Sequence, residues 1–228
     1  MDTIQKIKSI SIWIFIVPFI GINTCLILIT HFHELFAETD IIFPTFPYID
    51  GGASISRTAR PFPSWLVFKS TMFLTSFLLI RYWLYNREII QHFKKDHKYI
   101  KKIIFFGIGS AIFLTIHSIF LGIRFEYDLY KFFRRFVLLS FIIFEIIAQA
   151  YLVAIFYSMK KELKEFINVT YLRIKLILVS ILIVVAIISI PLISLPGNKF
   201  LKHALEWDYF LGVISFYLLT FLMWNTKK

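Results

Sequence analysis

Apolar residues fill this chain in long runs that short polar segments separate, without the alternating faces of amphipathic soluble helices. A helix needs about 20 mostly apolar residues to cross a bilayer. Six segments come close to or reach that length: 10–30, 65–85, 103–123, 136–157, 176–195 and 208–224. The pattern predicts an all-α membrane protein with a bundle of six transmembrane helices. Because these segments use most of residues 1–228, we expect a single polytopic membrane domain with an outer loop at 31–64.

The composition agrees with a membrane protein. Hydrophobic residues make up 58% of the chain and charged residues 17%, whereas a soluble domain is about half apolar and about a quarter charged. The net charge of +11 comes from basic residues at the ends of the apolar segments, where they face lipid head groups. We therefore expect membrane lipids as partners and no nucleic acid. Cys25 is the single cysteine, which excludes a disulfide framework, and no motif predicts a cofactor.

The distribution of Lys and Arg predicts the orientation. With the N-terminus inside, the inner segments hold 16 of the 25 basic residues and the outer segments hold 9. Arg81 and Lys175 are counted inside, because they lie at or beyond the inner ends of apolar segments. The excess places both termini in the cytoplasm. The candidate membranes are a plasma membrane, an inner membrane and an internal membrane. The candidate protein partners are a second copy of this chain and another membrane protein.

The longest stretch without helical pattern, 47–69, offers a candidate anion site. Arg57 and Arg60 carry forked donors that suit phosphate, and nearby hydroxyl groups and glycine amides add donors. Alternatively, the two arginines pair with acidic side chains at the interface and only close the bundle. The remaining candidates in this loop and at the last helix are Asp50, Ser56, Thr58 and Glu206.

Ionisable residues at membrane depth are a second candidate, because lipid penalises them. His117 lies about 9 Å from the outer end of its segment and Glu145 about 14 Å from the outer end of the next, at 1.5 Å per residue. Gln149 shares the helix face of Glu145. Because the two segments are joined by a short connection, we expect them to pack antiparallel and to bring His117 close to Glu145. The cluster either forms a polar site or fixes helix packing.

A metal site is a weaker hypothesis. His31, Glu34 and Glu38 have a spacing that places them on one helix face. They also lie at the predicted outer interface, where polar residues are common, and a zinc site needs three or four convergent ligands. We therefore assign no metal to this chain.

Two stretches resemble the DRAM/Frag/Sfk family of six-helix membrane proteins. The first contains Ile55-Ser56-Arg57-Thr58-Ala59, then Pro63, then Val67-Phe68; the second contains Glu206-Trp207 and Tyr217-x-x-Thr220-Phe221. Arg57 stands where that family commonly has an acid, and Asp50-Gly51-Gly52 precedes the motif, so the chain resembles a distant member. The resemblance implies six spans, cytoplasmic termini and a lipid-associated role, as in members that modulate autophagy or remodel the lipid of GPI anchors.

Three functions follow from these observations. The first is binding of a lipid head group in an outward-facing cavity under the first loop, by the candidate residues named above. The second is a membrane-embedded enzyme that modifies lipids, with His117 as base and a loop serine or a metal. The third is a proton-coupled transporter with Glu145 as the carrier.

Overall fold

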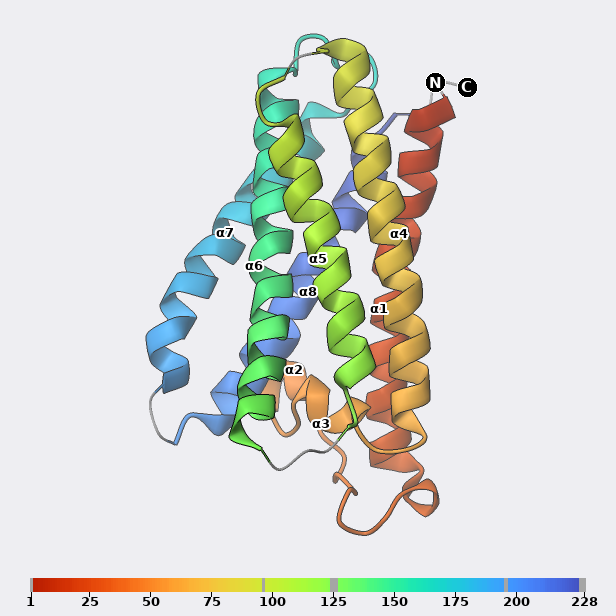
Figure 1. Ribbon diagram of the computed structural model, residues 1–228, viewed down its shortest axis with the longest axis vertical. Helices are drawn as coiled ribbons and strands as arrows, with labels where there is room; N and C mark the ends of the chain where they lie inside the picture. Colours follow the sequence, from red (N-terminus) through yellow and green to blue (C-terminus); the bar gives the residue numbers. More distant parts are fainter. Residues whose placement is uncertain (1, 96, 124–126, 195–196, 226–228) are drawn as a thin grey trace.

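The computed structural model of the protein describes residues 2–95, 97–123, 127–194 and 197–225. Helices dominate these ranges, and the only β-type contact in them is one isolated bridge. The predicted all-α class is therefore confirmed for this part of the chain. The long helices are α1 (Asp2–His31), α4 (Ser64–Phe93), α5 (Ile100–Phe120), α6 (Asp128–Ser158), α7 (Val169–Ser194) and α8 (Lys199–Met223) (Figure 1). Between α1 and α4 lie a short 3₁₀ helix, η1 (His33–Leu35), and two short helices, α2 (Pro47–Asp50) and α3 (Ile55–Ala59).

Five of these helices are long and apolar enough to cross a membrane: α1, α5, α6, α7 and α8. Helix α4 has 30 residues but carries Lys69 and Arg81, and it is not among the five. The chain is thus compatible with a multi-pass integral membrane protein. Each predicted segment overlaps one long helix, but α1, α6, α7 and α8 begin 7 to 9 residues earlier than hydropathy predicted. Hydropathy locates the apolar part of a helix, and the first turns of these helices carry charged or polar residues that extend beyond it.

The long helices form a closed ring. Each packs on the next in the order α1, α4, α5, α6, α7 and α8, and α8 packs back on α1. The start of α1 and the end of α8 lie together at one end of the bundle, which we call the termini end (Figure 1). The helices α2 and α3 lie at the opposite end, which we call the loop end.

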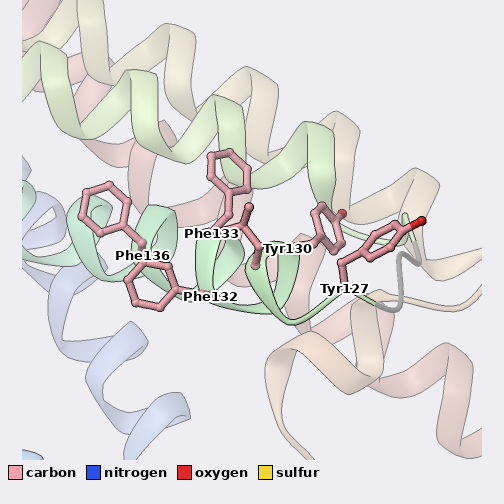
Figure 2. A pocket seen from close by; sticks show the side chains of 6 residues that line it. Tyr127, Tyr130, Phe132, Phe133 and Phe136 are labelled. Carbon is pink, nitrogen blue, oxygen red and sulfur yellow. The ribbon is translucent and has the colours of Figure 1, made fainter.

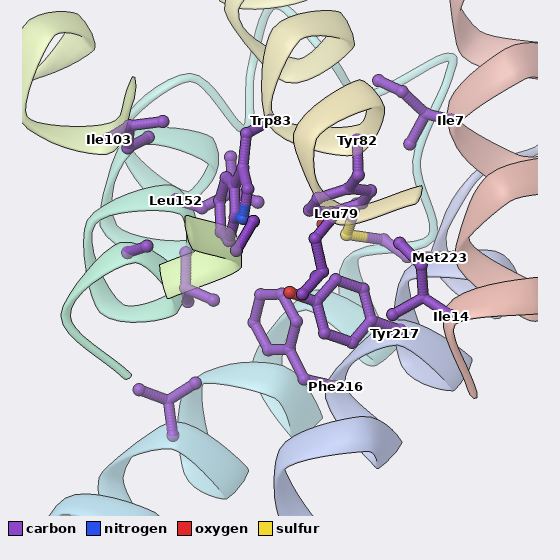
Figure 3. Close-up of a cluster of buried hydrophobic side chains, with 14 of the residues drawn as sticks. Ile7, Ile14, Leu79, Tyr82, Trp83, Ile103, Leu152, Phe216, Tyr217 and Met223 are labelled. Carbon is purple, nitrogen blue, oxygen red and sulfur yellow. The ribbon is translucent and has the colours of Figure 1, made fainter. Parts of the chain in front are cut away.

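Aromatic side chains fill the centre of the ring (Figure 3). Tyr82 and Trp83 of α4 pack edge to face with ring centroids 5.0 Å apart, and Tyr82 packs on Tyr217 of α8 at 4.9 Å. Gly107 allows α5 to approach α4, because a Cβ atom at that position would lie 2.4 Å from the Trp83 ring. The core therefore joins α4 to α8, two helices that α1 separates in the ring, as well as to its neighbour α5.

The first loop is fastened to the start of α8. The Trp207 indole N–H donates to Ala53 O at 2.8 Å, and the Nδ1–H of His203 donates to Gly51 O at 2.9 Å. The Tyr48 ring packs edge to face on Trp207 with centroids 5.0 Å apart. Gly51 has φ of 61°, and a Cβ atom on it would lie 1.8 Å from Phe200 O. The loop is therefore a folded cap that a left-handed glycine seats against α8.

Candidate functional site

Positive charges gather at the loop end around His203. Lys199 and Lys202 in the first turn of α8 and Arg57 of α3 all lie within electrostatic range of the His203 ring. Arg57, Lys199 and Lys202 are exposed, and none of the three has an ion-pair partner within the described ranges. We call these four residues the loop-end cation cluster. The two lysines also stand at a helix N-terminus, where the macrodipole already favours negative charge and disfavours cations.

Two acidic residues of the loop end, Asp50 and Glu206, contact backbone amides. Asp50 accepts hydrogen bonds from the Thr45 hydroxyl at 2.5 Å and from the amides of Phe46 and Gly52, each at 2.8 Å. These bonds, that of Thr45 first, hold the pKa of Asp50 below its usual value. The Glu206 carboxylate faces the backbone amides of Ser56 and Ile55 at the start of α3, and it also feels the charge of Lys202. Neither acid forms an ion pair with Arg57 among the residues described.

The other candidate residues of the first loop lie in α3 or at its ends, where most of their polar groups stabilise that helix. The Ser54 side chain caps α3 by accepting from the Arg57 amide at 3.2 Å, and the Ser56 hydroxyl lies 3.4 Å from it. Thr58 is fully buried and donates to Ile55 O at 2.8 Å. Arg60 is half-buried at the end of α3. Of the loop candidates, Arg57 is thus the one that offers an exposed donor group.

A second polar group lies in the centre of the bundle. The Glu145 carboxyl is 1% exposed and is surrounded by side chains from three helices. Ser110 Oγ of α5 lies 2.6 Å from Glu145 Oε2, while Gln149 Nε2 donates to Oε1 at 3.0 Å. The Tyr217 hydroxyl of α8 also donates to Oε1. Gln149 Nε2 reaches Val213 O of α8 at 3.3 Å as well, so α6 and α8 are joined across the ring.

Lys175 is a buried basic residue that the analysis of the sequence missed. Its side chain is 0% exposed, its Nζ donates to Thr220 Oγ1 at 2.7 Å, and the Nζ lies 3.9 Å from the Phe216 ring centroid. Counting it as a cytoplasmic loop residue was wrong, because α7 begins at Val169 and Lys175 points into the bundle. The sequence contained a signal for this burial, because helical spacing puts Lys175 on the same face of α7 as Leu172, Val179 and Leu182, and all four side chains are buried.

His117 does not meet Glu145. It is buried on α5, with its ring edge to face against Phe68 at 6.4 Å and Arg134 of α6 within electrostatic range. In the described residues no hydrogen bond reaches its ring. It lies seven residues from Ser110, which takes the position beside Glu145 that we expected for His117. Among the described residues, no serine hydroxyl is hydrogen-bonded to the His117 ring.

The acidic and histidine residues do not gather into a metal site. Among the residues that the structure describes, no group of three or more His, Cys, Asp or Glu side chains lies close enough to hold an ion. The hypothetical ligand His31 contacts the hydroxyl of Thr30 at 2.8 Å, and Glu34 lies in η1. These residues stay separate at the end of α1.

The outer surface of the bundle is apolar and aromatic near the loop end. A shallow depression of about 660 Å³ follows the first turns of α6 (Figure 2). Rings of Tyr and Phe residues dominate its lining, which consists of Tyr127, Leu129, Tyr130, Phe132, Phe133 and Phe136. Tyr127 and Phe132 are exposed by 74% and 65%. Such a surface suits acyl chains, with the tyrosines near the interface.

Comparison with known proteins finds no match for this chain among family models, curated proteins or solved structures.

Proposed function

We propose that this protein is a six-span membrane protein that binds the anionic head group of a membrane lipid at the loop-end cation cluster. The observation that carries the proposal is the gathering around His203 of three exposed cationic side chains that form no ion pair within the described residues. Guanidinium and ammonium groups suit phosphate oxygens, and the amides at the start of α8 add donors. The aromatic surface of α6 at the same end offers a place for acyl chains.

The hydrogen bonds of the cap lead us to propose a different location for the head group than the sequence did. The lipid-handling hypothesis placed the ligand under the first loop, held by Arg57 and Arg60 with His117 and Glu145 below. The loop's own hydrogen bonds to α8 occupy much of that underside. We therefore place the head group at the rim, between α3 and the start of α8. Lys199, Lys202 and His203 join Arg57 there, and Asp50, Ser56, Thr58 and Glu206 support the fold of the cap.

The six-span topology is part of the proposal. In α4, Lys69 Nζ turns to the loop end, where it donates to Ile119 O at 3.2 Å, and Arg81 stacks on Tyr85 toward the termini end. The two positions are about 18 Å apart at 1.5 Å per residue, and their long side chains extend toward the two interfaces. Helix α4 can therefore span the bilayer with both charges at head-group depth. The excess of basic residues at the termini end supports cytoplasmic termini.

The test is lipid binding by a triple variant with Arg57, Lys199 and Lys202 each changed to Gln. We expect it to lose co-purified anionic lipid, measured by mass spectrometry, and to lose the thermal stabilisation that anionic lipid gives the wild type in zwitterionic nanodiscs. The matched control changes Lys95, Lys161 and Lys164, three exposed lysines at the termini end, to Gln. Equal lipid retention in both variants, or equal loss, would contradict the proposal.

A further inference from the structure

The His203 ring at the centre of the loop-end cation cluster is held in one tautomer. Its Nδ1 atom lies 2.9 Å from Gly51 O. A carbonyl oxygen only accepts hydrogen bonds, so Nδ1 carries the ring proton and donates it. The close approach of Gly51 to Phe200 O keeps that carbonyl group beside α8. The other ring nitrogen, Nε2, is therefore the acceptor of a neutral imidazole.

The charges around the ring favour this neutral form. Lys199, Lys202 and Arg57 all lie within electrostatic range of the ring. Lys199 stands four residues before His203, so the two side chains are neighbours on one face of α8. A second ring proton would add a fourth positive charge to this group, and like charges disfavour it. The cluster thus presents one neutral acceptor among three cations.

The acceptor atom is open to a ligand. The His203 side chain is half-buried, and within the described residues no hydrogen bond reaches Nε2. Nε2 is also not among the polar atoms that those residues bury without a partner. Lysine and arginine side chains offer donors only, whereas Nε2 of this tautomer only accepts. The cluster therefore combines donors for an anion with a single acceptor for a donor group.

This combination selects among the head groups of anionic lipids. Phosphate oxygens accept hydrogen bonds, so they suit the lysines and the arginine but leave Nε2 without a partner. The ammonium group of a serine or ethanolamine head group donates, but the three cations repel its positive charge. A hydroxyl group donates without a charge. A phosphodiester that carries a hydroxyl-bearing alcohol therefore satisfies all four side chains.

We propose that the loop-end cation cluster selects phospholipids with a hydroxyl-bearing anionic head group, such as glycerol or inositol, through a hydrogen bond from a head-group hydroxyl to His203 Nε2. The phosphate lies at Lys199, Lys202 and Arg57, and the alcohol lies against the imidazole. The inference rests on the proposed function and names the class of lipid that the same site takes.

Apolar side chains next to the cluster favour a lipid over a free polyol phosphate. Phe200 and Leu201 follow Lys199 in the first turn of α8, and their side chains are exposed by 64% and 46%. Ile49 of α2, two residues before Gly51, is exposed by 81%. Acyl chains that enter the bilayer beside the bound head group cover such residues, whereas a soluble phosphate leaves them bare.

Lipids that differ only in the head group test the inference. The wild-type protein in phosphatidylcholine nanodiscs is titrated with phosphatidylglycerol, phosphatidylmethanol and phosphatidylserine of identical acyl chains, and binding is followed by thermal stabilisation. Phosphatidylmethanol is the matched control, because its phosphodiester has the same charge but no hydroxyl. We expect phosphatidylglycerol to bind roughly three- to tenfold more tightly than either of the others, the effect of one hydrogen bond. Glycerol phosphate without acyl chains should give no stabilisation.

Two variants of His203 separate its two nitrogen atoms. In His203→Asn the amide can still donate to Gly51 O but has no atom at the position of Nε2, so the ratio of the affinities for phosphatidylglycerol and phosphatidylmethanol should fall to about one. His203→Gln places its amide oxygen near the position of Nε2 and should keep part of the preference. His92→Asn, the same change at an exposed histidine of the termini end, should keep the wild-type ratio.

The outcomes distinguish this inference from the proposed function. A wild-type ratio near one, an unchanged ratio in His203→Asn, or an equal loss in both His203 variants would overturn the selection by Nε2 and leave anionic lipid binding standing. Stabilisation by glycerol phosphate equal to that by the lipid would assign the site to a soluble phosphate and overturn the inference. A wild type that binds none of the anionic lipids more tightly than phosphatidylcholine would refute the proposed function itself.

Discussion

Replacing Gly51 by alanine tests how tightly the first loop is seated on α8. Two costs add at this position. The residue has φ of 61°, and a left-handed conformation costs a non-glycine residue about 1–2 kcal/mol. The added Cβ would also lie 1.8 Å from Phe200 O, a backbone atom that cannot rotate away. Overpacking of this kind costs about 1–3 kcal/mol, so we expect Gly51→Ala to destabilise the cap by roughly 2–5 kcal/mol in total.

Gly197 provides a matched control within the same chain. Its φ is 90°, but a Cβ atom there would meet nothing within 4 Å. Gly197→Ala should therefore cost only the conformational part, about 1–2 kcal/mol. The assay is equilibrium unfolding in mixed micelles with increasing denaturing detergent, followed by circular dichroism and tryptophan fluorescence, because Trp207 reports on the cap. Equal losses of unfolding free energy in the two variants would refute the close approach of Gly51 to α8.

Three further predictions concern the same end of the bundle and the topology. Trp207→Phe keeps a ring against Tyr48 but leaves Ala53 O without its donor, so it should cost about 1–3 kcal/mol of unfolding free energy; a change within error in the same assay would contradict the bond. The folded pKa of Asp50 lies below its ordinary value of 3.8, so its contribution to the cap is present at neutral pH and is lost as the pH falls below 3.8 through the folded pKa. Protease cleavage of the loop, measured with an acid-stable protease, should rise over that range in the wild type, and Asp50→Asn should be cleaved readily at all pH values; parallel profiles would argue against this. Thiol labelling of intact cells should modify Phe43→Cys from outside and Lys161→Cys only after permeabilisation, since Cys25 is fully buried and stays silent; labelling of both from one side would overturn the six-span topology.

The sequence predicted the class of the fold, because long apolar runs leave few alternatives in a membrane. It did not predict the helix ends, and this error hid one residue of the buried polar group, Lys175. Lys175 directly precedes the run that begins at Leu176, so a hydropathy count placed it outside the bundle, whereas helical periodicity places it on the buried stripe of α7. The residue of α5 that faces Glu145 depends on how α5 is rotated and shifted relative to α6. The rule that helices joined by a short connection pack antiparallel does not give that rotation or shift. Ser110 rather than His117 faces Glu145 for that reason.

The loop-end cation cluster shows a similar limit. Arg57 stood out because it lies in an unusual loop, but Lys199 and Lys202 looked like ordinary interface residues. They become part of one surface only because α2 and α3 fold back onto the first turns of α8. That contact depends on Gly51 in the first loop and on His203 and Trp207 in α8, two segments that are far apart in sequence, so no local pattern predicts it.

The closure of the ring by α8 has a consequence for how the protein is made. Helix α8 follows the other five long helices in the chain, yet it supplies Tyr217 to Glu145 and Thr220 to Lys175, and it also packs on α1. Until α8 has joined the earlier helices, both buried ionisable groups lack these partners in an incomplete bundle. A nascent or truncated chain would then display an acid and an amine at membrane depth, the kind of defect that membrane quality control can recognise. Insertion of α8 covers both groups at once, so the step that closes the ring also removes both exposed polar groups from the bilayer.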